Sequence, residues 1–262
     1  MNVRLDGKRA LVCGSSQGIG KAVAVELAQS GAAVILLARN EAALKKVVTE
    51  LKAVSDQNHG YLVADFAQVA AVRKTIEQFV AGNPPVHILV NNTGGPPSGP
   101  IFEASAEEFV QAFSNHLVCN QVLAQTVVPG MKAEKYGRII NIISTSVKQP
   151  IKGLGVSNTV RGAVANWSKT LAGELAPFGI TVNNVLPGAT KTTRLSALIE
   201  TKAAKSGKTR EEVSSEMISA IPAGRFAEAS EIASAVAFLA SPAAAYINGI
   251  NLPVDGGRTL CL

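Results

Sequence analysis

The chain has 262 residues, 47% of them hydrophobic and 17% charged, so it is long and apolar enough to bury a large core. Its net charge is +6, but the basic residues are scattered singly or in pairs, which argues against a nucleic-acid-binding surface and favours a local phosphate site. The three cysteines, Cys13, Cys119 and Cys261, are too far apart in the sequence to indicate a metal site or a redox pair.

The first residues lack the apolar run of a signal peptide, and no apolar run approaches the roughly 18 residues of a membrane span. The odd number of cysteines favours a reducing compartment. We therefore expect a cytoplasmic protein that binds neither nucleic acid, membrane nor metal.

Seven short apolar runs rich in β-branched residues alternate with longer segments of helical periodicity. The runs cover residues 9–13, 33–38, 61–64, 87–91, 138–143, 180–186 and 250–254. Strands of this length joined by helical crossovers indicate βαβ units and hence a parallel sheet. No repeat or change in composition divides the chain, so we predict one α/β domain over residues 1–262. It would be a doubly wound Rossmann-type sheet with helices on both faces.

Two segments carry extra length, residues 144–156 after the fifth predicted strand and residues 188–223 after the sixth. The second segment has the pattern of two helices around Ser206 and Gly207. Ligands of open α/β sheets bind at the carboxyl ends of the strands, where both segments begin. We interpret residues 188–223 as a substrate lid.

The first predicted strand runs into a glycine-rich turn, Gly14-Ser15-Ser16-Gln17-Gly18-Ile19-Gly20, which precedes a helix. Glycines permit a tight turn and a close approach of the backbone to a pyrophosphate, and the helix N-terminus supplies free N–H groups. In this position the spacing predicts a nucleotide-binding site rather than a simple glycine-rich turn.

Arg39 follows the second predicted strand, where an acidic residue would accept hydrogen bonds from a ribose 2′-hydroxyl. A guanidinium pairs well with a 2′-phosphate instead. We therefore predict NADP(H) in preference to NAD(H); the alternative is a solvated surface arginine.

Several motifs in order make the chain similar to the short-chain dehydrogenase/reductase family over nearly its whole length. They are the glycine turn, Asp65 after the third strand, Asn91-Asn92-Thr93-Gly94 after the fourth, Pro187-Gly188 with Thr192 after the sixth, Gly224-Arg225-Phe226, and Val254-Asp255-Gly256-Gly257. The resemblance implies the strand order 3-2-1-4-5-6-7. It also implies a cofactor site built from Gly14, Ser16, Gln17, Gly18, Ile19, Gly20, Arg39, Asp65, Phe66, Asn91, Gly94, Arg161, Pro187, Gly188 and Thr192.

The resemblance further implies a homotetramer formed through two long helices, here roughly residues 106–134 and 157–177. Both helices carry apolar stripes, which suit a core as well as an interface. The stripes comprise Leu117, Val118, Val122 and Leu123 in the first helix, and Val164, Trp167 and Leu171 in the second.

The family catalyses carbonyl reduction or alcohol oxidation with a tyrosine, a lysine four residues later, a serine and an asparagine. Counting from the matching motifs, Ser144 keeps the serine, whereas Ser157, Arg161 and His116 occupy the tyrosine, lysine and asparagine positions. Residues i and i+4 share a helix face, so Ser157 and Arg161 are expected to point toward the cofactor together.

The replacements change the available acid–base chemistry. A serine hydroxyl is a far weaker acid than a phenol, and an arginine holds an oxyanion but does not act as a base. His116 has an ordinary pKa near neutrality, so it is a candidate proton carrier, directly or through water; the alternative is a histidine that only packs between helices.

Two functions follow from these residues. The first is an NADP(H)-dependent oxidoreductase acting on a small ketone or 3-oxoacyl compound, or on an alcohol or sugar, with Ser144, Ser157, Arg161 and His116 as its catalytic candidates. The second is a catalytically impaired NADP(H)-binding protein that serves as a sensor or partner subunit.

Overall fold

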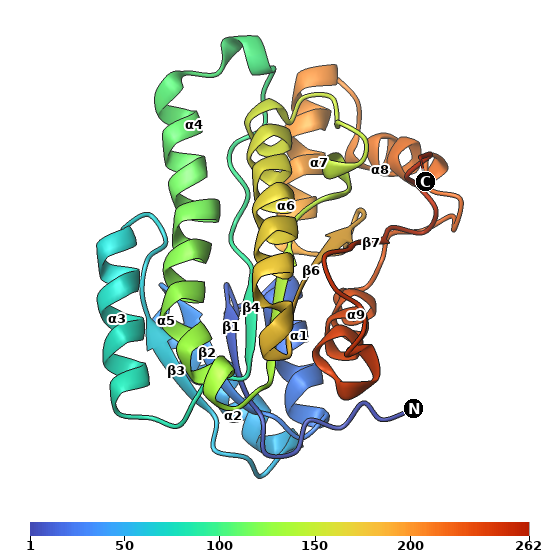
Figure 1. The fold of residues 1–262 in the computed structure, drawn as a ribbon. Coiled ribbons are helices and arrows are strands. Elements are labelled where there is room, and N and C mark those ends of the chain that lie inside the picture. The colour runs from blue at the N-terminus through green and yellow to red at the C-terminus, as the bar shows by residue number, and fades with distance from the viewer. Residues whose placement is uncertain (262) are drawn as a thin grey trace.

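The computed structural model describes residues 1–261 and contains a seven-stranded, all-parallel sheet (Figure 1). The strand order is β3-β2-β1-β4-β5-β6-β7, which confirms the predicted order. The strands are β1 (Arg9–Cys13), β2 (Ala33–Ala38), β3 (Gly60–Val63), β4 (Ile88–Asn91), β5 (Gly137–Ile142), β6 (Ile180–Pro187) and β7 (Asn251–Val254). Each lies within one residue of its predicted bounds, because a strand buried on both faces reads as an apolar run.

Helices cover both faces of the sheet, as predicted. The helices are α1 (Gly18–Gln29), α2 (Glu41–Val54), α3 (Val69–Ala81), α4 (Ala106–Phe113), α5 (Cys119–Ala133), α6 (Gly155–Leu175), α7 (Thr193–Ser206), α8 (Arg210–Ser219) and α9 (Ala229–Ala240). One core cluster joins the sheet to α1, α2 and α9, and a second joins the opposite face to α3, α5 and α6. Short 3₁₀ turns lie at Ile101–Glu103, Thr145–Val147, Ala176–Phe178 and Pro242–Ala244.

The helical connection after β4 is not regular. A π-helical segment, Ser114–Val118, joins α4 to α5 without a break in the helical path. Single π-helical turns inside longer helices are frequent at functional sites. This one contains His116, whose side chain is buried.

The two helices of the predicted lid have an apolar core of their own. Leu195 and Ile199 of α7 pack with Val213 of α8, and Ile221 and Phe226 complete this cluster. The segment is tied to the rest of the chain near its ends, where Thr190 pairs with Ala227 and Lys191 forms an ion pair with Glu228. α7 and α8 therefore form a compact unit beside the carboxyl edge of the sheet (Figure 1).

The apolar stripes on the long helices divide between core and surface. Val122, Leu123 and Val164 are buried within the chain, whereas Trp167 and Leu171 are half-buried. Leu117 and Val118 are half-buried as well. No helix within residues 1–261 combines the length and apolar character needed to cross a bilayer.

Candidate active site

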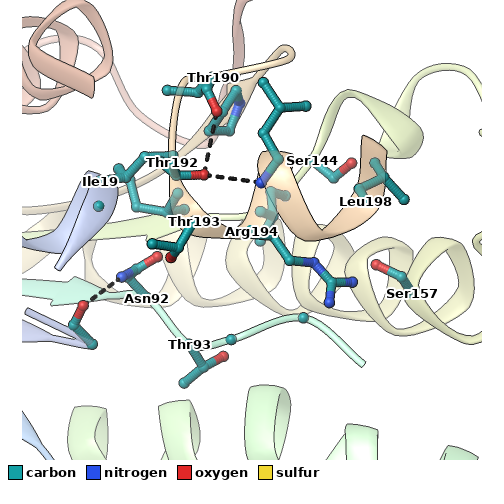
Figure 2. A pocket seen from close by; sticks show the side chains of 18 of the residues that line it. Ile19, Asn92, Thr93, Ser144, Ser157, Thr190, Thr192, Thr193, Arg194 and Leu198 are labelled. Carbon is teal, nitrogen blue, oxygen red and sulfur yellow. Dashed lines mark hydrogen bonds between the residues drawn. The ribbon is translucent and has the colours of Figure 1, made fainter. Parts of the chain in front are cut away.

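A cavity of about 790 Å³ opens at the carboxyl edge of the sheet (Figure 2). Its walls come from the turn after β1, the loops after β2 to β6, and the helices α6 and α7. All carboxyl ends of a parallel sheet lie at one edge, so residues far apart in the sequence meet here. The cavity is therefore where the predicted site residues are expected to come together.

The glycine turn is shaped by close backbone contacts. Gly14 and Gly18 have φ values of +57° and +56°, which favour glycine, and a Cβ on Gly14 would lie 2.5 Å from the carbonyl oxygen of Asn92. α1 then begins at Gly18 without a side-chain cap and without an acidic residue in its first turn. Its free N–H groups and partial positive charge thus face the cavity, an arrangement that suits a phosphate.

Gly20 was predicted to bind the cofactor, but it does not line the cavity. A Cβ on Gly20 would lie 2.3 Å from the carbonyl oxygen of Gly14. The residue is glycine because the first turn of α1 packs directly on the preceding backbone. Gly20 therefore contributes to the shape of the turn.

Asn91 was also predicted to bind the cofactor, and the structure places it elsewhere. Its side-chain amide is buried and donates to Asn141 at 2.8 Å, within a network that includes Ser168 and Asn184. The next residue, Asn92, lines the cavity and donates to the carbonyl oxygen of Gly14 at 3.2 Å (Figure 2). It also donates to the carbonyl oxygen of Cys13 at 3.2 Å. Asn92 therefore holds the glycine turn, while Asn91 braces the sheet from within.

The other predicted cofactor residues all line the cavity. They are Gly14, Ser16, Gln17, Gly18, Ile19, Arg39, Asp65, Phe66, Gly94, Arg161, Pro187, Gly188 and Thr192. Thr192 caps α7, because its hydroxyl accepts a hydrogen bond from the backbone N–H of Leu195 (Figure 2). Thr192 also limits the space beside Gly18, where a Cβ would lie 3.3 Å from its methyl group. The turn before α1 and the start of α7 thus form opposite sides of one groove.

Three of the four predicted catalytic residues meet in the same cavity. Ser144 follows β5, and its hydroxyl oxygen accepts a hydrogen bond from the backbone N–H of Ser146 at 3.0 Å, which leaves its own hydrogen free to donate. Ser157 lies one turn before Arg161 on α6, and no hydrogen bond forms to its side chain within residues 1–261. Both hydroxyls face the cavity (Figure 2).

Arg161 is the most buried cation of the cavity, with 8% of its surface exposed. One guanidinium nitrogen donates to the carbonyl oxygen of Ile142 at 2.9 Å, which anchors the side chain to the end of β5. Burial, and secondly the charge of Arg194, lower the pKa of Arg161 to about 10. Arg161 still carries its positive charge at neutral pH.

His116 does not reach the cavity directly. It is 2% exposed, and its Nδ1 forms a hydrogen bond with the hydroxyl of Thr93, which does line the cavity. Burial, and secondly the charge of Arg161, lower the pKa of His116 to about 2. This histidine is neutral at physiological pH and lies behind Thr93, which agrees with the packing alternative and not with a titrating proton carrier.

None of the chain's three tyrosines lines the cavity. The Tyr136 hydroxyl donates to the carbonyl oxygen of Ala240 at 2.7 Å, and the Tyr61 hydroxyl donates to Glu41. Tyr246 is fully exposed. The lining residues of this cavity therefore include no phenol that could serve as an acid or base.

Sequence reasoning missed several residues of the cavity wall. They are Asn92, Thr93, Thr190, Thr193, Arg194, Leu198, Lys202 and Arg258. Asn92 and Thr93 belong to the motif Asn91-Asn92-Thr93-Gly94, so the sequence indicated the correct loop but not these two residues. Arg194, Leu198 and Lys202 recur at four-residue intervals in the predicted lid, a spacing that could have placed them on one helix face.

A parallel sheet whose first turn offers bare backbone N–H groups, next to a cluster of hydroxyls and a buried arginine, defines a Rossmann-type nucleotide-binding protein with an adjoining reaction pocket. A family model described as "Enoyl-(Acyl carrier protein) reductase" matches residues 14–259. The chain belongs to the short-chain dehydrogenase/reductase family.

Similar proteins of known identity cover the chain almost end to end. The 3-oxoacyl-(acyl-carrier-protein) reductase FabG of Vibrio cholerae is 36% identical over 97% of this chain and 98% of its own length. The L-sorbose reductase of Gluconobacter frateurii, solved with NADPH and L-sorbose, is 31% identical with a TM-score of 0.94, over 100% of both chains. A gluconate 5-dehydrogenase of Burkholderia cenocepacia, solved with NADP and tartrate, is 32% identical with a TM-score of 0.88, over 100% of this chain and 98% of its own.

Proposed function

We propose that this protein is an NADP(H)-dependent oxidoreductase that interconverts a carbonyl and a hydroxyl group without the family's tyrosine–lysine pair. The observation that carries the proposal is the convergence of Ser144, Ser157 and Arg161 on the cavity that also contains the glycine turn. The substrate is a small ketone or 3-oxoacyl compound, or the corresponding alcohol or sugar. Relatives that reduce 3-oxoacyl groups or sorbose support this substrate range.

The residues present fit NADP(H). The uncapped start of α1 suits the pyrophosphate, and Asp65 lies where the adenine would be held after β3. Arg39 is exposed at the end of β2 and lines the same groove, so its guanidinium suits a 2′-phosphate. The names of two solved relatives include NADPH or NADP, in agreement with this assignment. When bound, the cofactor supplies or accepts the hydride.

The protein's own residues then stabilise the negative charge that develops on the reacting oxygen. The Ser144 hydroxyl donates to that oxygen while its own oxygen remains fixed by the Ser146 N–H. Arg161 stabilises the negative charge that develops, because a guanidinium in a poorly hydrated site interacts strongly with an oxyanion. Ser157 connects the oxygen to solvent water. Because no tyrosine lines the cavity, we assign the proton to water, and the hydroxide that remains is neutralised by bulk solvent.

We further propose that the chain is a single domain, residues 1–262. Residues 188–223 form a lid over the end of the cavity that binds the substrate. α7 supplies part of the cavity wall, and the α7–α8 unit has its own small core, which suits a segment that moves as one body. Closure would exclude water from the reacting groups.

A second candidate function is a catalytically impaired NADP(H)-binding sensor or partner subunit. The observation that favours it is the state of the acid–base residues: no tyrosine lines the cavity, and the pKa of His116 is held near 2 by burial. Such a protein would bind the cofactor at the glycine turn and transfer no hydride.

A single-turnover experiment separates the two functions. NADPH deuterated at the transferable position is mixed with the protein and with a pool of ketones and oxoacyl thioesters, and deuterated alcohol is sought by mass spectrometry. Deuterium in a product supports the oxidoreductase. Tight NADPH binding without transfer favours the sensor.

Matched variants connect any transfer to the proposed residues. Ser144→Ala and Arg161→Met should each slow the transfer by about 100-fold or more, as for a removed oxyanion donor. Arg73→Gln removes a guanidinium from α3, whose one ion pair within residues 1–261 is with Glu77, and should leave the transfer unchanged. Equal rates in all four proteins would show that the reaction does not use these groups.

A further inference from the structure

The guanidinium of Arg161 has unused donors in the cavity. An arginine has five N–H donors, and only the one that binds Ile142 has an acceptor within residues 1–261. No carboxylate among these residues forms an ion pair with Arg161. A cation with more than nine-tenths of its surface buried usually has a partner of opposite charge.

A second guanidinium lies beside the first. A Cβ built on Gly95 would be 3.6 Å from Nη2 of Arg194 and 4.0 Å from Nη2 of Arg161, so both nitrogens flank the same glycine. Arg194 is held there by a hydrogen bond to the carbonyl oxygen of Pro96 at 2.8 Å. In Figure 2 its side chain extends from α7 into the space lined by Ser144, Ser157 and Leu198.

The positive charge continues along one face of α7. Arg194, Leu198 and Lys202 follow at four-residue intervals, and all three line the cavity. The neighbouring face of the helix, with Leu195 and Ile199, packs into the lid's core, and Leu195 also borders the cavity. This packing fixes the rotation of α7 about its axis, so that Arg194 and Lys202 line the cavity.

No acidic residue of the cavity balances this charge. Among the lining residues only Asp65 carries a carboxylate, and it follows β3. β3 is four strands away from β5, where Arg161 is anchored, and this corresponds to about 19 Å at the usual strand spacing. The cofactor's 2′-phosphate would lie near Arg39 at the end of β2, also remote from β5 and β6. The ribose of a bound cofactor is neutral and gives the buried Arg161 no partner of opposite charge, while Arg194 is exposed beside it.

We infer that the substrate carries an anionic group, a carboxylate or a phosphate, which Arg194 binds beside Arg161 while the reacting oxygen faces Ser144. This inference rests on the proposed oxidoreductase function and narrows its substrate class to anionic carbonyl or hydroxyl compounds. The planar fork of a guanidinium matches both anions with paired hydrogen bonds. Leu198 lies between the two cations of α7 that line the cavity, Arg194 and Lys202, and suits a short apolar portion of the substrate.

The experiment uses compounds that differ in the anionic group alone. Pyruvate and acetoacetate are compared with their methyl esters, and dihydroxyacetone phosphate with dihydroxyacetone. Each is tested for NADPH oxidation and, by calorimetry, for binding to the protein saturated with NADP⁺, a complex in which hydride transfer is not possible. Wild type, Arg194→Gln and the control Arg73→Gln are measured alongside NADPH affinity.

The inference requires that an anion bind more tightly than its neutral partner and that Arg194→Gln weaken this binding by about 10- to 100-fold, the effect of losing a charged hydrogen bond. NADPH affinity and the Arg73→Gln protein should stay unchanged. Preference for the acids identifies a carboxylate, and preference for dihydroxyacetone phosphate identifies a phosphate.

Other outcomes separate this inference from the proposed function. Reduction of neutral compounds as readily as anions, with wild type and Arg194→Gln alike, overturns the anion site and leaves the oxidoreductase standing. Anion binding lost in Arg194→Gln, but without NADPH oxidation, supports the anion site and counts against the oxidoreductase. Absence of anion binding to the NADP⁺ complex overturns the inference, and so does an equal loss of NADPH affinity in Arg194→Gln, because that arginine would then belong to the cofactor site.

Discussion

Thr93 and His116 are joined by a hydrogen bond between the threonine hydroxyl and Nδ1 of the imidazole, at the wall of the cavity. The histidine behind this bond is almost wholly buried, and its pKa is lowered to about 2, mainly by burial. Between pH 6.5 and 2 the unfolded chain therefore binds a proton that the native protein does not. Stability falls as the pH drops through this window and is unaffected by His116 above it.

The first prediction concerns acid stability. From pH 7 to pH 5, wild type should lose about 2 kcal/mol more unfolding free energy than His116→Gln, from about 1.4 kcal/mol per pH unit below the unfolded pKa. Urea unfolding at both pH values measures this difference. His59 and His87 also have a pKa lowered by burial, but both proteins retain them, so their effect cancels. Identical acid sensitivity of the two proteins would contradict a buried, neutral His116.

The second prediction concerns cofactor choice. Arg39→Ala should weaken NADPH binding by about 10- to 100-fold, because one charge-assisted hydrogen-bonding group is lost, and should leave NADH binding unchanged. Fluorescence titration with each nucleotide measures both affinities. Arg73→Gln, a charge change on α3, serves as the control. A wild-type protein that binds NADH as tightly as NADPH would disprove the assigned role of Arg39.

The third prediction concerns the glycine turn. Gly20→Ala should unfold at lower urea concentration than wild type and lose NADPH affinity, because its Cβ would lie 2.3 Å from the carbonyl oxygen of Gly14. Gly173→Ala is the matched control: Gly173 lies inside α6, is exposed, and has no atom within 4 Å of a built Cβ. It should stabilise the protein by about 0.5–1 kcal/mol. Equal stability of the two variants would show that the turn yields to the added methyl group.

The fold could be predicted from the sequence because its signals are local and repeated. Every strand is an apolar run, and each crossover has a helical pattern, so both element types and their order follow from periodicity. The glycine turn was equally readable, since its backbone positions tolerate little else. The strand order came from the family resemblance, because periodicity alone does not specify which strands are neighbours.

The site was only partly predictable because two neighbouring residues can point their side chains in different directions. Asn91 is the last residue of β4, so its side chain points into the sheet's packing, while Asn92 just beyond it lines the cavity. Strand side chains alternate, and a motif does not show which of two adjacent asparagines faces the ligand. For a related reason the sequence left two roles open for His116: its pKa depends on burial and on Arg161, neither of which the sequence displays.

The last prediction concerns assembly through the long helices. Val110 and Phe113 of α4 remain 66% and 43% exposed, and Trp167 of α6 is half-buried, with its indole N–H donating to Gln121 of α5 at 2.7 Å. This apolar surface lies on the helices through which we expect the homotetramer to form.

Val110→Glu should therefore dissociate the tetramer, because burying a carboxylate in an apolar contact is strongly unfavourable. Val54→Glu places the same substitution at an exposed position at the end of α2 and should leave the tetramer intact. Sedimentation velocity at micromolar concentration compares the three proteins. A wild-type monomer under these conditions would refute the tetramer, and dissociation by both variants would mean that α4 is not its specific contact surface.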